Sequence, residues 1–358
     1  MKVIIFLTRI LRWLIYFKKI IREKTATQRR IYVKDRTDFY KQMWGNAAAI
    51  LGADFKTLSG AFWEINRDSK MVRLHNYMVP LDDPVTLRIA GTKDLCYSML
   101  TEINIPIPDY TVFEVSQIKK GICFFKEKKG PFVVKPSSGT SGARGISLWV
   151  RTNFDFMSAV ALASLYDKRI LIEQMITGES YRLLFLGDRL LHAARRTGVR
   201  VIGNGSSSLH QLIEDTMINI STANSAFKDD SDLKFTLTSQ NYSLNYVPKN
   251  GEQILVKSLP EYQKEEQEII TEYTENITSK LSKSIVNTAL KASKQLGVYF
   301  AGVDLITTDP TIPLEHSGGA IIDVNSTPGL HHHYNLKNQS ERDQPAVLVL
   351  KHLLGINE

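Results

Sequence analysis

The hydrophobic residues of the first third of the chain change from a helical spacing to short strand-like runs and back. A helix is predicted over 36–52, because its apolar residues recur every three or four positions: Phe39, Met43, Ala47 and Ile50. Short strands and a second helix are then predicted at 55–58, 62–65, 72–74 and 85–103. We take residues 28–105 as a small N-terminal α/β lobe.

The middle of the chain alternates strand-like and helical patterns, which is typical of an α/β architecture. Strands are predicted at 132–135, 146–150 and 170–174, with a helix at 154–167 and a hairpin that turns at Gly187-Asp188. Residues 197–262 are polar, so we expect an inserted loop region with a short helix at 208–215. Periodic apolar positions over 262–296 predict one long helix that ends at Gly297.

Composition is that of a soluble globular protein, with 43% hydrophobic and 23% charged residues. The formal net charge is +8, but nine basic residues and a single acid fall within residues 1–30. The rest of the chain balances its acids and bases, so we expect no nucleic-acid partner. Two cysteines, Cys96 and Cys123, fit a reducing, cytoplasmic setting. We also expect a homo-oligomer.

Residues 1–27 have the pattern of a basic amphipathic helix. Arg9 and Arg12 interrupt the apolar run too early for a membrane-spanning helix, which needs about 20 mainly apolar residues. Two interpretations stay open. One is a peripheral contact of residues 1–24 with the inner face of the membrane. The other is a helix whose apolar face packs on the body or on a second subunit.

Two apolar runs near the C-terminus carry oxygen ligands. Asp323 and Asn325 are two positions apart in the run 321–325, so they point to one face of a strand. Asp304 lies in the run 301–306, which we predict as the neighbouring strand. Such oxygen donors suit Mg²⁺, which completes its shell with phosphate oxygens. The alternative is that Asp-x-Asn only forms a turn.

A loop rich in glycine and hydroxyl residues, 137–145, follows a strand that ends in Lys135-Pro136. Its backbone N–H groups suit the wrapping of phosphate oxygens. The loop lacks the Gly-Lys-Ser/Thr of a Walker A motif, and it does not open a helix as the dinucleotide fingerprint does. It predicts a mobile flap over a nucleotide, with an ordinary flexible hairpin as the alternative.

Lys135 with its flap, the segment 170–179 and the two acidic strands together resemble the ATP-grasp superfamily. The likeness is to the ATP-grasp domain of cyanophycin synthetase and to the fused glutathione synthetases, and it spans residues 80–350. The resemblance implies an α/β (α+β) ATP-grasp fold in which two α/β subdomains, 106–177 and 178–358, clasp ATP. The second subdomain contains the insertion 197–262, and the lobe 28–105 and the helix 1–27 precede both.

The resemblance also implies the cofactors ATP and Mg²⁺ and a set of ATP-binding residues. These residues are Lys93, Lys135, Ser138, Gly139, Ser141, Gly142, Gly145, Glu173, Gln174, Met175, Ile176 and Glu179.

The same resemblance assigns metal, catalytic and substrate positions. Mg²⁺ would be held by Asp304, Asp323 and Asn325. The catalytic positions, which would stabilise charge on the γ-phosphate, are Arg182, Arg195 and Arg196. The turn that would contact substrate contains Ser326, Pro328 and Gly329. The family usually has Glu at the position of Asp323; Asp is one methylene shorter and bridges two metals less readily.

His331, His332 and His333 follow this turn. Adjacent histidines point in different directions, and no Cys or other His lies at ligand spacing, so zinc is not expected. They line the substrate end or are exposed, and the sequence favours exposure.

These features lead to the hypothesis of an ATP-dependent carboxylate–amine ligase, which forms an amide through an acyl phosphate. Its substrates would be an amino acid or small peptide, by resemblance. Two rival hypotheses are a non-catalytic ATP-binding module at a membrane and a phosphotransferase that stops at phosphorylation. We expect a cytoplasmic protein, with peripheral membrane contact as the finer hypothesis.

Overall fold

The computed structural model describes residues 10–14, 16, 27–139, 145–196, 198–220, 231–258, 261–262, 267–268, 275–334, 336 and 344–356. The chain forms two compact units. Unit 1 comprises Met1–Ala26, Pro108–Met175 and Thr197–Glu272, and unit 2 comprises Thr27–Ile107, Ile176–Arg196 and Tyr273–Glu358. The domain boundaries predicted from the sequence, after residues 27, 105 and 177, stay predictions.

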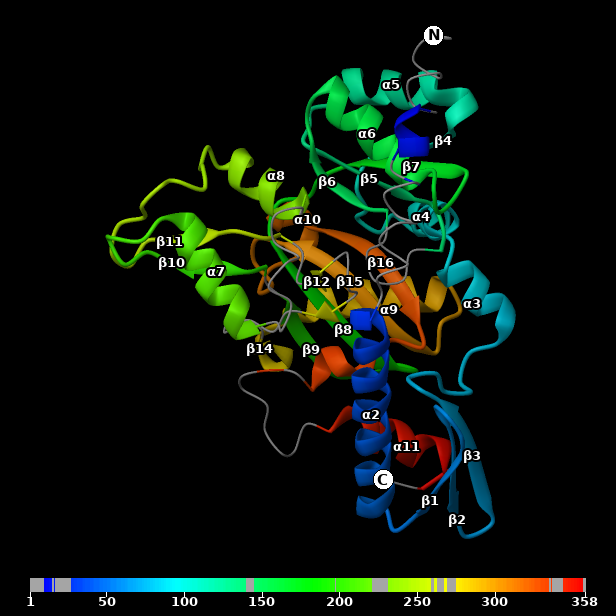
Figure 1. The fold of residues 1–358 in the computed structure, drawn as a ribbon. Helices are drawn as coiled ribbons and strands as arrows, with labels where there is room; N and C mark the ends of the chain where they lie inside the picture. The colour runs from blue at the N-terminus through cyan, green and yellow to red at the C-terminus, as the bar shows by residue number, and fades with distance from the viewer. Residues whose placement is uncertain are drawn as a thin grey trace. The chain divides into compact units, whose positions relative to one another are not determined.

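Unit 1 contains a four-stranded antiparallel sheet in the order β4-β7-β5-β6 (Figure 1). One face of the sheet, which includes Phe113, Phe132 and Ile172, forms a buried core with α5 and α6. The capping box of Thr152 and Asp155 starts α6. The strands and helix predicted here are confirmed. The bounds are β4 Tyr110–Glu114, α5 Ile118–Glu127, β5 Phe132–Pro136, β6 Ser147–Val150, α6 Asn153–Ala163 and β7 Arg169–Gln174.

The insertion in unit 1 has more structure than the sequence predicts. Two helices and a two-stranded sheet enclose a core of their own, to which Val201, Leu209 and Leu233 belong. Lys257 and Asp232 form an ion pair inside it, with Nζ and Oδ2 3.5 Å apart and both side chains almost wholly buried. The elements are β10 Arg200–Ile202, α7 Leu209–Ile220, α8 Ser231–Ser239 and β11 Gln253–Leu255.

The long helix predicted over 262–296 is wrong. The helix of this region, α9, spans Lys283–Gln295, because the Ser282 side chain caps it by accepting from the Ile285 N–H at 3.2 Å. Short strands precede it, namely β12 Glu261–Tyr262, β13 Gln267–Glu268 and β14 Glu275–Asn276. The predicted end at Gly297 is confirmed, since Gly297 follows the C-cap with a φ of 70°.

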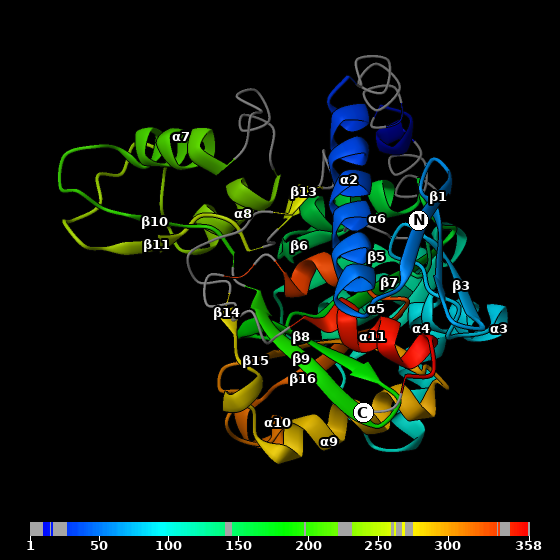
Figure 2. The same ribbon diagram turned by 90° about the horizontal axis from the view of Figure 1, so that it is seen from below.

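Unit 2 is built on a five-stranded sheet in the order β14-β9-β8-β15-β16, in which every pairing is antiparallel. One face packs on α9 through a core that includes Leu183, Ala193 and Val303. Figure 2 shows α9 on one side of this sheet and α2 and α11 on the other. The bounds are β8 Glu179–Leu186, β9 Arg189–Arg196, β15 Phe300–Thr307, α10 Leu314–Ser317, β16 Ala320–Ser326 and α11 Pro345–Leu353.

The N-terminal lobe belongs to unit 2. Helix α2, Thr27–Ile50, packs beside α11 and beside the antiparallel sheet of β1 Asp54–Ser59, β2 Phe62–Arg67 and β3 Lys70–His75. The predicted first helix and three strands are confirmed. The helix predicted over 85–103 is instead two helices, α3 Pro84–Ala90 and α4 Lys93–Glu102, because Gly91 caps the first and Thr92 precedes the second.

Within the part of the chain that the structure describes, no helix has the length and apolar content needed to cross a bilayer. The predicted N-terminal helix lies largely outside the described residues.

The close approach of Gly178 to β15 gives a test of this fold. Gly178 has a φ of 138°, and a Cβ there would lie 2.3 Å from the Thr307 carbonyl carbon. We expect Gly178→Ala to lower the free energy of unfolding by about 3 kcal/mol, because side chains rarely adopt this conformation and no space is present. Urea denaturation followed by circular dichroism measures the loss. Gly318→Ala is the matched control, since Gly318 has a φ of 65° and nothing within 4 Å of its added Cβ. Equal losses in the two variants would contradict the close packing.

Candidate functional site

A row of polar side chains crosses one face of the unit 2 sheet. Asp304 on β15 lies directly opposite Asp323 on β16, and Gly302 lies opposite Asn325. The Asn325 side-chain amide donates to Asp304 Oδ2 at 3.2 Å. The structure therefore brings together the three predicted metal ligands, on the face opposite the α9 core.

Two cations neutralise these carboxylates. Arg182, from β8, makes a two-pronged contact with Asp304, with its Nε 2.6 Å from Oδ1. Lys93, at the first position of α4, places its Nζ 2.6 Å from Asp323 Oδ2. Burial raises the pKa of Asp304. The positive charges of Arg182, Arg196 and Lys93 lower it by more, so this pKa is below its ordinary value.

The donor set suits a hard cation. Like charges that lie directly opposite each other on paired strands repel, so the Asp304–Asp323 pair requires a cation nearby. Two carboxylates and an amide oxygen are ligands that Mg²⁺ accepts. Among the described residues, no group of three His, Cys, Asp or Glu side chains could hold a metal ion, so a site here depends on the Asn325 amide.

The three predicted arginines do not lie together. On the paired strands β8 and β9, Arg196 lies opposite Ser180 and Ala194 lies opposite Arg182. Residues two apart on a strand share a face, so Arg196 lies on the same polar face as Arg182. Arg195 lies opposite Tyr181 on the other face, and its Nη2 is 3.2 Å from Glu275 Oε1. The strand period of two explains this separation.

Unit 1 holds the predicted phosphate lysine. Lys135 on β5 and Glu173 on β7 lie on the sheet face away from α5 and α6, with Nζ and Oε1 2.7 Å apart. Both side chains are buried. The Glu173 carboxylate therefore faces Lys135. The backbone N–H groups of Gln174 and Met175 donate to the carbonyls of Asp109 and Pro131.

The two ends of the Gly-rich loop are described. Ser138 donates to the Asp167 carboxylate at 2.7 Å. Gly139 and Gly145 both have left-handed backbone, and a Cβ on Gly145 would lie 2.7 Å from the Tyr166 ring. Ser141 and Gly142 lie outside the described residues.

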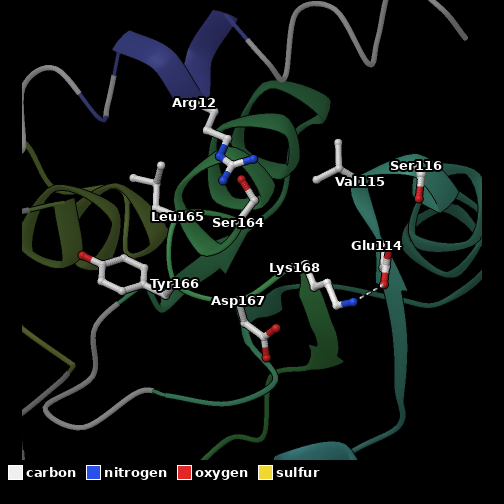
Figure 3. A pocket seen from close by; sticks show the side chains of 9 residues that line it. All are labelled: Arg12, Glu114, Val115, Ser116, Ser164, Leu165, Tyr166, Asp167 and Lys168. Atoms are coloured by element: carbon white, nitrogen blue, oxygen red, sulfur yellow. Dashed lines mark ion pairs between the residues drawn. The ribbon is translucent and has the colours of Figure 1, made fainter.

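A cavity of about 390 Å³ in unit 1 lies beside the loop that holds Asp167. Figure 3 shows Asp167 and Lys168 at this cavity, with Lys168 3.9 Å from the Glu114 carboxylate. The cavity is lined by none of the site residues predicted from the sequence.

The turn that is predicted to contact substrate, which contains Ser326, Pro328 and Gly329, lies over the polar face of unit 2. A Cβ on Gly302 would lie 2.6 Å from Pro328, so the absence of a side chain at Gly302 lets Pro328 approach β15. Gly329 is similarly close to the His331 ring. Ile176 and Glu179 also belong to unit 2, and Glu179 pairs with Thr307 at the start of β8.

The three histidines after this turn are buried, so the expectation of exposure is wrong. His331 and His332 are each 6% exposed and His333 is fully buried. His333 Nδ1 lies 2.9 Å from Nδ1 of His192 on β9. Burial lowers the pKa of His332 and of His333 well below its ordinary value, with nearby Arg182 and Arg196 adding to the effect.

Sequence reasoning missed His192, Arg36 and Tyr40, which surround the histidine segment. The sequence does mark His192 as a neighbour of the predicted site. His192, Ala194 and Arg196 alternate along one strand, so their side chains share a face. Arg36 and Tyr40 are on α2, far away in the sequence, and no local pattern marks them.

The fold and the site define a class of protein. The structure is similar to the crystal structure of a bifunctional glutathione synthetase from Pasteurella multocida. Its TM-score is 0.54 and its identity 19%, over 85% of this chain and 41% of that chain. The mixed α/β fold is that of ATP-grasp ligases.

Curated relatives agree with this assignment. The chain is 29% identical over 280 residues to the glutathione biosynthesis bifunctional protein GshAB of Clostridium perfringens, covering 75% of this chain and 35% of the relative. It is 25% identical over 254 residues to the cyanophycin synthetase of Trichormus variabilis, covering 69% of this chain and 27% of the relative. The chain thus spans about a third of the length of these relatives. No protein-family model matches it.

The buried histidines predict acid sensitivity. Below about pH 6.5, the unfolded chain takes up protons on histidine, whereas His332 and His333 stay neutral in the folded chain. The unfolded state then binds more protons, so the free energy of unfolding falls as the pH falls, by about 1.4 kcal/mol per pH unit for each such group. We expect the free energy of unfolding of His333→Gln to fall by about 1.4 kcal/mol less than that of the wild type between pH 7.5 and 5.5, measured by urea denaturation. The exposed His316→Gln is the control. Parallel pH profiles for His333→Gln and the wild type would contradict this.

Proposed function

We propose that the chain is an ATP-dependent carboxylate–amine ligase. A substrate carboxylate attacks the γ-phosphorus of ATP and ADP leaves, which gives an acyl phosphate. An amine then attacks the acyl carbon, phosphate leaves, and the amine loses a proton as the amide forms. The observation that supports this proposal most is the row of Asp304, Asp323 and Asn325 beside Lys93 and Arg182.

The proposal assigns each charged group a role. Asp304, Asp323 and Asn325 would hold Mg²⁺, which supplies neutralisation of phosphate charge when bound. Lys93 would leave Asp323 and bind a phosphate oxygen of ATP. Lys135 would leave Glu173 and bind a phosphate oxygen in the same way. The exchange at Lys93 leaves no charge unpaired, because Asp323 would bind Mg²⁺ while Lys93 binds phosphate.

Arg182 and Arg196 are proposed to stabilise the charge that develops on the transferred phosphoryl group. Both lie on the polar face, whereas Arg195 does not, so we leave Arg195 out of this role. The remaining ATP-binding positions, from Ser138 to Glu179, are proposed on the resemblance alone.

Covalent thiol chemistry does not fit this site. Cys96 is the cysteine near Asp323, and burial, with the Asp323 charge adding, raises the pKa of its thiol to about 12. A thiol with such a pKa stays protonated and is a poor nucleophile. Phosphoryl transfer requires the protein mainly to position the reactants and to stabilise charge, and the groups of the polar face are suited to both.

The proposed substrates are an amino acid or a small peptide, in line with the names of the relatives. The turn that contains Ser326, Pro328 and Gly329 would contact the second substrate. The relatives do not favour the non-catalytic module or the phosphotransferase. Membrane contact through residues 1–24 and a homo-oligomeric state stay predictions.

Release of ADP tests the reaction. Purified protein with Mg-ATP and a matrix of amino acids and dipeptides should release ADP only when both a carboxylate and an amine are present. Mass spectrometry should then find a product lighter by one water than the two substrates together. Release of ADP with one substrate and no amide would support a phosphotransferase, and no release across the matrix would reject the ligase.

Substitutions of Asp323 test its proposed role as a metal ligand on the polar face. Asp323→Asn keeps the shape of the side chain but removes its charge, so we expect activity to fall by about a hundredfold or more. Asp323→Glu keeps the charge and should retain most activity. The control Asp188→Asn changes an exposed carboxylate at the β8–β9 turn and should have no effect. Equal activity of Asp323→Asn and the wild type would remove Asp323 from the site. Circular dichroism checks that the variants are folded.

A further inference from the structure

The carboxylate of Asp82 binds the backbone where β15 begins. Its Oδ1 accepts a hydrogen bond from the Tyr299 N–H at 2.6 Å, and its Oδ2 accepts one from the Phe300 N–H at 3.3 Å. Asp82 lies in the loop before α3, 217 positions before Tyr299 in the chain. Hydrogen bonds to an ionised group are stronger than neutral ones, so this carboxylate joins the loop to the start of β15.

The turn that is proposed to contact the second substrate lies at the same end of the sheet. Ala301 on β15 is paired with Ser326 on β16, and the two strands are antiparallel. The residues at the outer side of this pair, Phe300 and Thr327, are therefore neighbours. Asp82 also accepts a hydrogen bond from the Thr327 backbone N–H. One side chain thus binds both the start of β15 and the residue that follows β16.

Thr327 has a backbone conformation that needs support from its surroundings. Its φ is 42°, which is rare for a β-branched residue, and it precedes Pro328, which restricts the backbone further. Such conformations persist only where the surrounding contacts fix them, and they gather at functional sites. Pro328 packs closely on β15, because a Cβ at Gly302 would lie 2.6 Å from it. The turn is therefore fixed at Thr327 by Asp82 and at Pro328 by close packing.

The neighbouring aspartate, Asp83, makes different contacts. It is the N-cap of α3, and its Oδ1 accepts from the N–H of Val85 at 2.8 Å and from the N–H of Thr86 at 3.2 Å. A side-chain oxygen at this position satisfies the first N–H groups of a helix. Helix α3 is thus capped by Asp83, whereas the hydrogen bonds of Asp82 go to β15 and to the turn. Removal of one carboxylate or the other separates the two effects.

We propose that Asp82 is a positioning residue that holds the turn of Thr327, Pro328 and Gly329 in the conformation that meets the second substrate. This proposal rests on the ligase function proposed above. Asp82 acts through the backbone of Thr327, so it needs no contact with either substrate. In the proposed reaction the amine must meet the acyl phosphate in a defined orientation, and displacement of the groups that orient it slows the reaction. Loss of Asp82 should therefore weaken use of the second substrate and leave Mg-ATP binding unchanged.

Steady-state kinetics with a substrate pair that gives an amide test this role. Asp82→Ala should raise the KM for the second substrate by about tenfold or more, which is the range expected for loss of a hydrogen bond to a charged group. The KM for Mg-ATP should stay that of the wild type. Asp82→Asn keeps one acceptor oxygen, so its KM for the second substrate should lie between those of the wild type and Asp82→Ala.

Asp83→Ala is the matched control, because it removes the adjacent carboxylate and with it the N-cap of α3. It should lower the midpoint of thermal unfolding and leave both KM values unchanged. A purely structural role for Asp82 makes the same prediction for Asp82→Ala: the midpoint would fall, and the ratio of the two KM values would stay that of the wild type. That result would overturn the proposal.

Hydrogen–deuterium exchange of the protein without substrates separates this proposal from the ligase function. Mass spectrometry should find faster exchange in Asp82→Ala in the peptides that contain Tyr299, Phe300 and Thr327. Asp83→Ala should change only the peptide that contains the start of α3. Faster exchange in the turn would support the positioning role even if no substrate pair gives an amide. Unchanged exchange at Thr327 would reject the role of Asp82, and an amide formed by the wild type would then leave the ligase function intact.

Discussion

Two carboxylates lie directly opposite each other in the unit 2 sheet, and much of the structure around them follows from that constraint. Asp304 is buried and faces Asp323 across the β15–β16 pairing. A buried carboxylate that faces a partly buried one is tolerated only when cations accompany them. Arg182 supplies one from β8 and Lys93 supplies the other from the start of α4. The positions of two elements are therefore tied to the same pair of acids.

Unit 1 also pairs buried opposite charges on one face of its sheet. Lys135 and Glu173 form a buried ion pair on the sheet face away from the helices. In both units, one face of a sheet packs on helices and the opposite face carries paired charges. Strand alternation produces this division, because successive side chains point to opposite faces. A phosphate and a metal ion that bind together can divide such a pair without leaving a charge alone, because the lysine then pairs with the phosphate and the carboxylate with the metal ion.

The sequence predicted much of this arrangement, and its failures have physical causes. Asp323 and Asn325 were placed on one face by their spacing, and the structure agrees. The same rule, applied to Arg195 and Arg196, would have separated them, but the resemblance grouped them. The helix predicted over 262–296 failed because apolar periodicity does not show where a capping residue such as Ser282 starts a helix.

Local properties were determined by the sequence itself: the strand periods, the turn at Gly187-Asp188, the glycine stop at Gly297 and the shared face of Asp323 and Asn325. Only the tertiary structure decided which faces are buried and which distant residues meet. His331 reads as an exposed residue until α2 brings Arg36 and Tyr40 against it from about 290 positions away. His192 and His333 likewise meet across 141 positions. Burial and pairing of polar groups depend on chain segments far apart in sequence, so a local pattern carries no record of them.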